Sequence, residues 1–388
     1  MEKTSDWILY MGTYPPRKCG IATFTKDLVT AMDEKSNPAI KSKILAMNYS
    51  VAPIKYPRKV IFQLNQEDVQ GYIDVAEKIN KTDEIKLVNI QHEFGIFGGY
   101  YGAYLLKFVE TLKKPLIVTF HTVVPHIAHK SNTRKKIVKA IAKKAKRIIV
   151  LNKLAIDILR EDYDIDDSKI VVIPHGIHAI AFENSIKEKT KLGYKDRIVL
   201  TTFGFIRNSK GYEYVIDALP KVVDAFPNVL YLIVGETHPV IRSKKGESYI
   251  MFLKSRVKKL GIQGNVRFIN SYVTLDEVLG YLKATDLYLC PTVSFGQIVS
   301  GTLAYAMGCG RAVVSTPFLH AKEVVTRDRG IVVDEFKNPK LFSDAIIEIL
   351  SNPSLKDKME KNAYANTRHM VWDNVAESYM NVFKEYMP

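Results

Sequence analysis

The chain has 388 residues, of which 47% are apolar, so it is long enough for two domains that each bury a core. Its net charge of +15 favours association with phosphates, polyanions or anionic lipid. Three cysteines without a CxxC pair argue against a disulfide framework and a zinc site. The absence of long apolar runs argues against a signal peptide and a membrane span. We therefore expect a cytoplasmic protein.

Short apolar runs alternate with helical patterns along the chain. Runs typical of strands buried on both faces lie at 7–11, 44–47, 87–90, 116–120 and 148–151, with helical patterns such as 23–32 and 68–80 between them. A second series lies at 198–203, 229–234, 266–269, 287–289, 312–315 and 330–333. This repeated alternation predicts an α/β fold with two doubly wound domains.

The domain boundary is expected near residue 180. We predict an N-terminal domain over residues 1–180 and a C-terminal domain over residues 181–371, with the polar stretch 183–196 as a linker. The last segment, 372–386, predicts an amphipathic helix.

Positive charge is concentrated in residues 133–147, which hold eight Lys or Arg and no acid. Apolar residues recur there at helical spacing, up to Ile148, so the segment predicts a basic amphipathic helix. Two interpretations stay open: an outer helix with a solvated lysine-rich face, or a helix that docks on anionic lipid headgroups. The second interpretation implies a peripheral protein on the inner face of the membrane.

Two strand–loop–helix junctions carry residues suited to an anion. After the first predicted strand, the loop 12–23 holds two prolines that stiffen it and Gly20, which lets backbone approach a ligand before a helix begins. An ordinary structural turn explains the same residues. In the second series, the loop 202–211 carries Arg207 and Lys210, which can neutralise a diphosphate that becomes a leaving group, although unpaired surface cations are common.

A third junction lies within residues 291–323, which predict a buried strand, a polar turn, a helix, a second buried strand and a loop. The turn Ser300, Gly301 and Thr302 is expected to present free backbone N–H groups and two hydroxyls at a helix N-terminus, where a phosphate binds favourably. Simple capping of the helix accounts for the same pattern without a ligand.

Histidines follow several predicted strands. His121 ends the fourth predicted strand, and His92, next to Glu93, follows the third. Histidines in such places often only serve the backbone, because both ring nitrogens form hydrogen bonds readily. The spacing of the histidines and acidic residues does not suggest a metal site, and no paired-Asp motif precedes a strand. The sequence therefore predicts chemistry that does not depend on a metal.

These motifs, in this order, resemble those of the group 1 retaining glycosyltransferases, which have the GT-B fold of two Rossmann-like domains facing across a cleft. Residues 15–21 resemble the family's P-P-x-x-G-G-I loop, residues 204–211 resemble G-R-L-x-x-x-K-G, and residues 306–310 resemble an AMACG-like run. The resemblance covers nearly the whole chain. It implies that the helix at 372–388 packs back on the first domain, and that the protein moves a hexose from a nucleotide-diphosphate sugar to a sugar or lipid-linked hydroxyl.

The resemblance also implies roles for individual residues. The catalytic set would be His121, Arg207 and Lys210, with Arg207 in place of an Arg that is usual at Phe205. Counting back without gaps from residue 306, two usual acids fall on Gln297 and Tyr305, which can still hydrogen-bond sugar and ribose hydroxyls. The remaining donor contacts would be Gly20, Ile21, Ser300, Gly301 and Thr302, and the acceptor-side residues His92 and Glu93.

No cofactor is expected besides the GDP- or UDP-linked substrate. Similarity of residues 91–99, 300–310 and 315–323 to a mannose-handling branch of the family suggests mannose. Two alternatives are a sugar phosphorylase of the same fold, which needs a pyridoxal-phosphate lysine and a longer chain, and a basic protein that binds polyanions or nucleic acid. No basic motif interleaved with aromatic residues supports the latter, so we expect no nucleic-acid partner.

Overall fold

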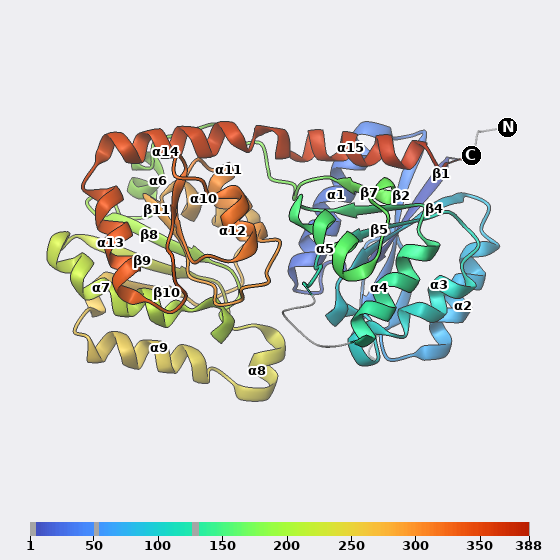
Figure 1. Ribbon diagram of the computed structural model, residues 1–388, viewed down its shortest axis with the longest axis horizontal. Helices are drawn as coiled ribbons and strands as arrows, with labels where there is room; N and C mark the ends of the chain where they lie inside the picture. Colours follow the sequence, from blue (N-terminus) through green and yellow to red (C-terminus); the bar gives the residue numbers. More distant parts are fainter. Residues whose placement is uncertain (1–4, 50–53, 126–131, 388) are drawn as a thin grey trace. The chain divides into compact units, whose positions relative to one another are not determined.

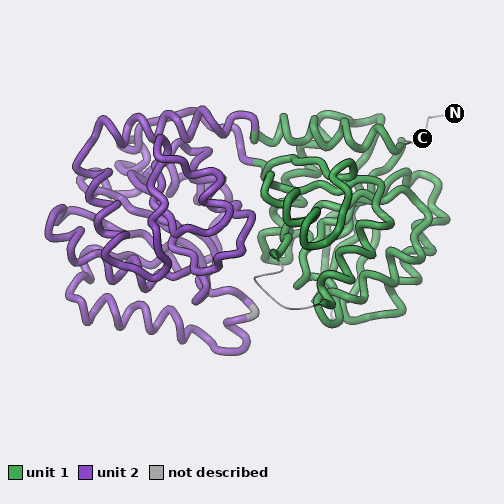
Figure 2. The backbone as a smooth tube through the Cα atoms, viewed as in Figure 1, with its two compact units in different colours: residues 1–176, 370–388 green, residues 177–369 purple. Residues whose placement is uncertain are grey.

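The computed structural model describes residues 5–49, 54–125 and 132–387, and the chain divides into two compact units. Unit 1 comprises residues 1–176 and 370–388, and unit 2 comprises residues 177–369 (Figure 2). Each unit is a parallel β-sheet with helices packed on its faces (Figure 1). The two-domain α/β fold that the sequence predicts is confirmed, and each predicted strand is present.

Unit 1 contains a seven-stranded sheet with the order β3-β2-β1-β4-β5-β6-β7. Its strands are β1 (Asp6–Gly12), β2 (Ile40–Asn48), β3 (Val60–Asn65), β4 (Ile85–His92), β5 (Leu116–Phe120), β6 (Arg147–Val150) and β7 (Ile170–Val172). Its helices are α1 (Gly20–Ser36), α2 (Val69–Asn80), α3 (Leu105–Thr111), α4 (Asn132–Lys144), α5 (Leu154–Tyr163) and α15 (Trp372–Lys384). The strand order reverses between β1 and β4, and ligands of open α/β sheets bind at such a switch point.

Two strands of this sheet were not expected. β3 and β7 form its two edges and are only partly buried; Gln63 interrupts the apolar run of β3, and β7 has only three residues. His121, expected after the fourth strand, therefore follows the fifth, β5. The basic helix α4 also ends before Arg147, which begins β6, and Ile148 belongs to that strand rather than to the helix.

The final helix α15 packs on unit 1. Tyr379 and Phe383 on α15 are fully buried, and the Phe383 ring lies 6.1 Å from the ring of Tyr10 on β1. At the other end of α15, Asp373 forms a 2.9 Å ion pair with Lys35, in the last turn of α1. The last helix of the chain thus completes the layer that also contains the first helix.

Unit 2 contains a six-stranded sheet with the order β10-β9-β8-β11-β12-β13. Its strands are β8 (Ile198–Phe203), β9 (Val229–Val234), β10 (Val266–Ile269), β11 (Leu287–Cys290), β12 (Ala312–Ser315) and β13 (Gly330–Val332). Its helices are α6 (Ile186–Lys191), α7 (Tyr212–Ala225), α8 (Pro239–Lys245), α9 (Ser248–Lys259), α10 (Leu275–Lys283), α11 (Gly301–Gly308), α12 (Leu319–Val324), α13 (Pro339–Leu350) and α14 (Pro353–Asn366). The switch point lies between β8 and β11.

The stretch 183–196 is not a linker. It contains α6, and the buried Lys189 on this helix forms a 2.5 Å ion pair with the buried Asp286. Asp286 also accepts hydrogen bonds from the Ser185 hydroxyl and the Val199 N–H, so the charge is fully bonded inside unit 2. The prediction of a linker was wrong because a charged stretch is usually solvated, and the sequence does not show that these charges pair with distant residues.

Candidate functional site

The loop after β8 brings two cations together. Burial lowers the pKa of Lys210, and the nearby Arg207 lowers it further. Arg207 also adds to the effect of burial in lowering the pKa of His238. Within the described part of the chain, no carboxylate pairs with Arg207 or Lys210, and Nε of Arg207 is buried without a hydrogen-bond partner. Neighbouring cations in a partly buried loop repel each other until an anion joins them, so this loop favours an anionic ligand.

Backbone contacts fix this loop against the loop after β11. The Ser209 carbonyl accepts hydrogen bonds from the Val293 N–H and the Thr292 hydroxyl, both at 3.0 Å. Gly211, which follows Lys210, has a φ of 66°, and a Cβ there would lie 2.3 Å from the Pro291 carbonyl oxygen. Only glycine allows both this conformation and this close approach.

In the turn before α11, one backbone N–H group is hydrogen-bonded to a side chain, and the next two have no acceptor within the helix. Ser300 is the N-cap: its hydroxyl accepts from the Leu303 N–H at 3.3 Å, as simple capping requires. Its own N–H donates to Nδ1 of His320 at 3.0 Å, so the expectation that this N–H is free is wrong. The N–H groups of Gly301 and Thr302 open the helix, and the first N–H groups of a helix have no acceptor within it. These two N–H groups remain suited to an anion.

The cationic loop and the α11 turn lie close together. A Cβ on Gly204 would lie 3.3 Å from Cγ2 of Thr302. Cys290, at the end of β11, is near both the cationic loop and the α11 turn. Burial raises the pKa of Cys290, and the charge of Lys210 and the hydroxyl of Ser300 each oppose this rise. Unit 2 therefore gathers Arg207, Lys210, Ser300, Gly301 and Thr302 at the carboxyl ends of β8 and β11.

Gln297 and Tyr305, which stand where the family has acids, lie on the same loop and helix. The Gln297 side-chain amide donates to the Val299 carbonyl at 2.9 Å, so its Oε1 is the end better placed to meet a ligand. The Tyr305 ring is partly buried and stacks on His178 with 5.9 Å between centroids. Both residues keep hydrogen-bonding groups but no charge.

In unit 1, the loop after β1 leads directly into α1. Cys19 caps the helix, with its Sγ accepting from the Ala22 N–H at 3.3 Å. A Cβ on Gly20 would meet nothing within 4 Å, so the space beside this backbone is open, and Ile21 next to it is half-buried. Arg17 in the same loop binds the Met47 carbonyl at 2.8 Å and is therefore held by the protein itself.

His121 lies just beyond β5, with 7% of its surface exposed. Its Nε2 is 2.7 Å from Oε1 of Gln91, and its ring packs edge-on to Phe24 at 4.6 Å. Burial lowers the pKa of His121 to about 3, with smaller effects from His175 and His92. His121 is therefore a neutral imidazole at physiological pH.

The two residues expected on the acceptor side are held by the protein. His92 is fully buried among Phe94, Phe97 and Phe120, so it cannot touch an acceptor in this structure. Glu93 accepts from the Phe94 N–H at 3.0 Å and from the Thr122 hydroxyl, which makes it a support of the loop after β4.

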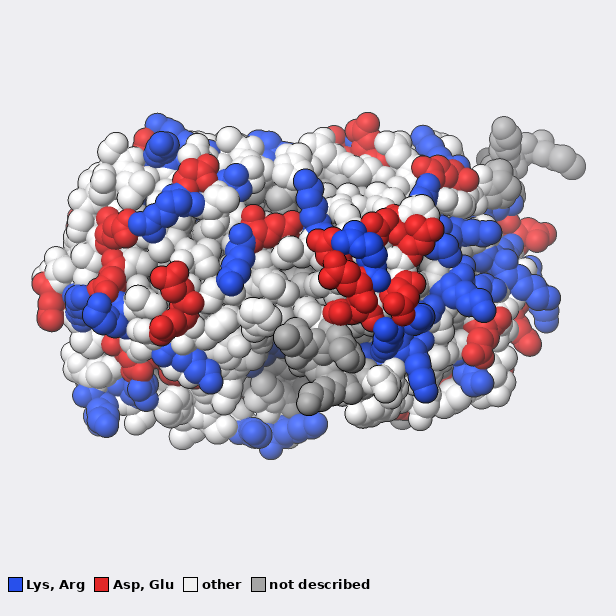
Figure 3. All heavy atoms as spheres, viewed as in Figure 1, with Lys and Arg blue, Asp and Glu red and all other residues white. Residues whose placement is uncertain are grey.

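The basic helix α4 presents its lysines unevenly. Lys135 and Lys139 pair with Asp164 at 3.3 and 2.9 Å. Lys136, Lys143 and Lys144 are exposed, and none of the described acids pairs with them. Figure 3 shows basic side chains over the region of α3 and α4, beside acidic side chains over the region of α5. In the described residues, no helix is both long and apolar enough to span a membrane.

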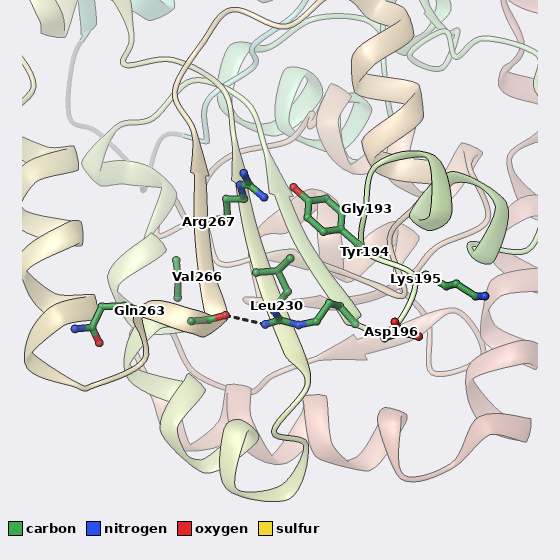
Figure 4. Close-up of a pocket in the computed structure, with 10 residues that line it drawn as sticks. Gly193, Tyr194, Lys195, Asp196, Leu230, Gln263, Val266 and Arg267 are labelled. Carbon is green, nitrogen blue, oxygen red and sulfur yellow. Dashed lines mark hydrogen bonds between the residues drawn. The ribbon is translucent and has the colours of Figure 1, made fainter.

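A hollow of about 570 Å³ lies elsewhere in unit 2, at the amino ends of β8, β9 and β10 (Figure 4). Tyr194 and Arg267 line it, and the Arg267 guanidinium lies 5.8 Å from the Tyr194 ring. This is the opposite edge of the sheet from the cationic loop and the α11 turn. Because open α/β sheets bind ligands at the carboxyl edge, we place the candidate site there and not in this hollow.

Comparison with known proteins places these features in a family. Residues 183–366 match the model for glycosyl transferases group 1, and residues 24–179 match that for glycosyltransferase family 4. An uncharacterized glycosyltransferase of Methanocaldococcus jannaschii is 27% identical over 259 residues, which cover 64% of this chain and 61% of that protein. The phosphatidyl-myo-inositol mannosyltransferase of Mycobacterium tuberculosis is 24% identical over 283 residues, or 70% and 67% of the two chains.

The crystal structure of Anabaena HepE in complex with UDP matches with a TM-score of 0.75 at 16% identity, over 97% of this chain and 99% of that one. The fold is therefore that of the GT-B glycosyltransferases. The chain belongs to the group 1 glycosyltransferases, with an N-terminal part of the family 4 type. The alignment spans about three fifths of the length of the Methanocaldococcus relative. Neither the phosphorylase nor the polyanion-binding alternative is favoured by this membership.

Proposed function

We propose that this protein is a retaining glycosyltransferase that moves mannose from a nucleotide-diphosphate sugar to a hydroxyl of a carbohydrate or lipid-linked acceptor. Family membership supports the reaction class. The name of the mycobacterial relative supports both mannose and a lipid-linked acceptor. The UDP in the HepE structure supports a nucleoside diphosphate as the leaving group, and GDP and UDP are the two candidates for this chain.

The observation that carries the proposal is the pair Arg207 and Lys210 beside the turn Ser300 to Thr302, all within unit 2. When the bond between sugar and phosphate breaks, negative charge grows on the departing diphosphate. Cations and N–H groups that packing already holds in place stabilise this charge without reorganising during the reaction. The acceptor hydroxyl then attacks the sugar from the face that the phosphate leaves and passes its proton to the departing phosphate oxygen, so no enzymic nucleophile is required.

Other residues would recognise the donor and the acceptor. Oε1 of Gln297 would accept from a hydroxyl of the sugar, and the Tyr305 hydroxyl would bind the ribose, in place of the family's acids. In unit 1, we assign Gly20 and Ile21 to the donor and His121 to the transferred sugar, following the resemblance. The chemistry needs neither a metal nor a cofactor besides the donor.

We also propose that α4 attaches the protein to anionic lipid. The support is the exposed and unneutralised set on one helix, Lys136, Lys143 and Lys144. Each basic residue near a charged surface contributes ~1 kcal/mol of attraction. A lipid-linked acceptor would then lie on the same surface as the enzyme.

The proposal is tested with purified protein and a panel of nucleotide sugars: GDP-mannose, UDP-mannose, UDP-glucose and UDP-N-acetylglucosamine. Released nucleoside diphosphate is measured with and without a lipid extract as acceptor. We expect release above background with a mannose donor, increased by lipid, and product NMR should show the anomeric configuration of the donor. If nucleoside diphosphate is released from none of the donors, the glycosyltransferase assignment is contradicted. If a donor with another sugar is preferred, only the assignment of mannose is refuted. An inverted product would refute retention.

A further inference from the structure

A chain of buried hydrogen bonds runs beneath the proposed sugar-binding His121. Gln91 and Asn89 lie two residues apart on β4, so their side chains share one face of the sheet. Nε2 of Gln91 donates to Oδ1 of Asn89, and Nδ2 of Asn89 donates to the Ile117 carbonyl at 3.2 Å and the Thr119 hydroxyl at 3.3 Å. Asn89, Gln91 and Thr119 have no exposed surface.

The direction of this chain is fixed at the Ile117 carbonyl. A backbone carbonyl oxygen only accepts hydrogen bonds, so the Asn89 side chain must turn its NH₂ group toward it and its Oδ1 toward Gln91. Gln91 must then turn its own NH₂ group toward Asn89, which leaves its Oε1 facing His121. Each amide orientation follows from the preceding one, because the reverse orientation would place two acceptors or two donors against each other.

The consequence falls on the histidine ring. Oε1 of Gln91 lies 2.7 Å from Nε2 of His121 and can only accept, so the proton of the neutral ring must reside on Nε2. Nδ1 then carries a lone pair, and none of the residues that the structure describes donates to it. The low pKa of about 3 fits this assignment, because a neutral ring has a single proton to place.

We propose that Gln91 and Asn89 are positioning residues that hold His121 as the Nε2–H tautomer, so that Nδ1 accepts a hydrogen bond from a hydroxyl of the transferred sugar. The role in transfer rests on the proposed function, while the tautomer itself does not. With the opposite tautomer, Nε2 would face Oε1 without a proton, and the buried network would lose this hydrogen bond. Nδ1 would then be a donor, so the sugar hydroxyl would have to accept from the ring instead of donating to it.

The sequence contains a signal for this network. Asn89 and Gln91 are polar residues at alternate positions of a strand whose other residues are mainly apolar and buried. An uncharged polar residue inside such a strand needs partners on the neighbouring strand, because a buried polar group without a hydrogen bond is costly. The spacing of Asn89 and Gln91 therefore predicts that β5 supplies hydrogen-bond acceptors on the same face of the sheet.

NMR of the free protein labelled with ¹⁵N-histidine tests the tautomer directly, because long-range ¹H–¹⁵N correlations distinguish Nε2–H from Nδ1–H rings. The His121 signals are assigned by their loss in His121→Asn. We expect one Nε2–H tautomer at pH 7 in the wild type. Gln91→Met removes the acceptor, and Asn89→Leu frees the Gln91 amide to turn, so both should give a mixture of tautomers.

Tyr379→Phe is the matched control. It removes the hydroxyl that lies 3.3 Å from Thr119 at the far end of the network, but leaves the Ile117 carbonyl in place, so the Nε2–H tautomer should persist. An Nδ1–H ring in the wild type would overturn the proposal, and so would an unchanged tautomer in both Gln91→Met and Asn89→Leu.

The activity measurement separates this inference from the proposed function. In Gln91→Met and Asn89→Leu, sugar transfer should fall ~5-fold, the effect expected from a lost hydrogen bond of ~1 kcal/mol. Nucleoside diphosphate affinity should stay unchanged. A lost tautomer with an unchanged transfer rate would refute the role in transfer. A wild type that transfers no sugar would refute the proposed function, while the NMR result would still decide the tautomer.

Discussion

The buried His92 makes a quantitative prediction about acid stability. Neither of its ring nitrogens has a hydrogen-bond partner among the described residues, and burial lowers the pKa of His92 to about 3. In the unfolded chain the ring returns to its ordinary value of 6.5. The folded pKa is the lower one, so between these values the unfolded state binds the proton and the folded state does not. Stability is therefore lost as pH falls below 6.5.

The size of the loss follows from the pH interval. At pH 6.5 the unfolded state holds about half a proton more than the folded state, and this excess approaches one proton at pH 5. A full proton is worth ~1.4 kcal/mol per pH unit, so His92 should cost ~2 kcal/mol at pH 5. His92→Leu replaces the ring with an apolar side chain that does not titrate. We expect the stability of this variant relative to the wild type to rise by ~2 kcal/mol between pH 7 and pH 5.

Urea denaturation followed by tryptophan fluorescence measures this difference. The two tryptophans, Trp7 and Trp372, both belong to unit 1, so their signal reports the unit that contains His92. His369→Leu, at an exposed position of unit 2, is the control and should reproduce the wild-type pH dependence. Wild-type and His92→Leu curves that stay equally far apart at pH 7 and pH 5 would refute the reasoning.

Three further predictions concern the proposed function. Lys210→Ala should retain the fold but lose at least ~10²-fold in turnover, as when a charge-stabilising group is removed, and normal turnover would contradict its role. His121→Ala should depress sugar transfer and leave nucleoside diphosphate affinity nearly unchanged, whereas a joint loss would make the residue structural. Vesicles with anionic lipid should bind the protein and release it when salt is added. Replacing Lys136, Lys143 and Lys144 together by glutamine should abolish this binding. Equal binding to neutral vesicles would leave only a solvated helix face.

Much of the fold was predictable because its central strands are buried on both faces. β5, β8, β9 and β12 have the bounds that their apolar runs predict. Two partly buried edge strands were missed: Gln63 interrupts the apolar run of β3, and β7 has only three residues. The helix α6 was missed because the pairing of Lys189 with Asp286 joins residues far apart in the chain.

The candidate site was predictable as far as loops and residue types, and no further. The sequence identified Lys210 and Ser300 on two separate loops, but their proximity to the same Cys290 depends on the order of β8 and β11 in the sheet. The sequence also did not reveal that His320 accepts the Ser300 N–H, or that aromatic rings enclose His92. Such contacts depend on side-chain packing between distant segments.

The most direct test of the central claim, that Arg207, Lys210 and the α11 turn hold the diphosphate of a donor, is calorimetric titration with GDP, GMP, UDP and UMP. We predict that at least one diphosphate binds the wild type ~10-fold or more tightly than its monophosphate, a difference of ~1.4 kcal/mol, and that Lys210→Ala removes most of this difference. Because burial and Arg207 lower the pKa of Lys210, diphosphate affinity should weaken as pH rises through that lowered value, and Lys210→Arg should weaken less. Equal affinity for diphosphates and monophosphates in the wild type would contradict the account.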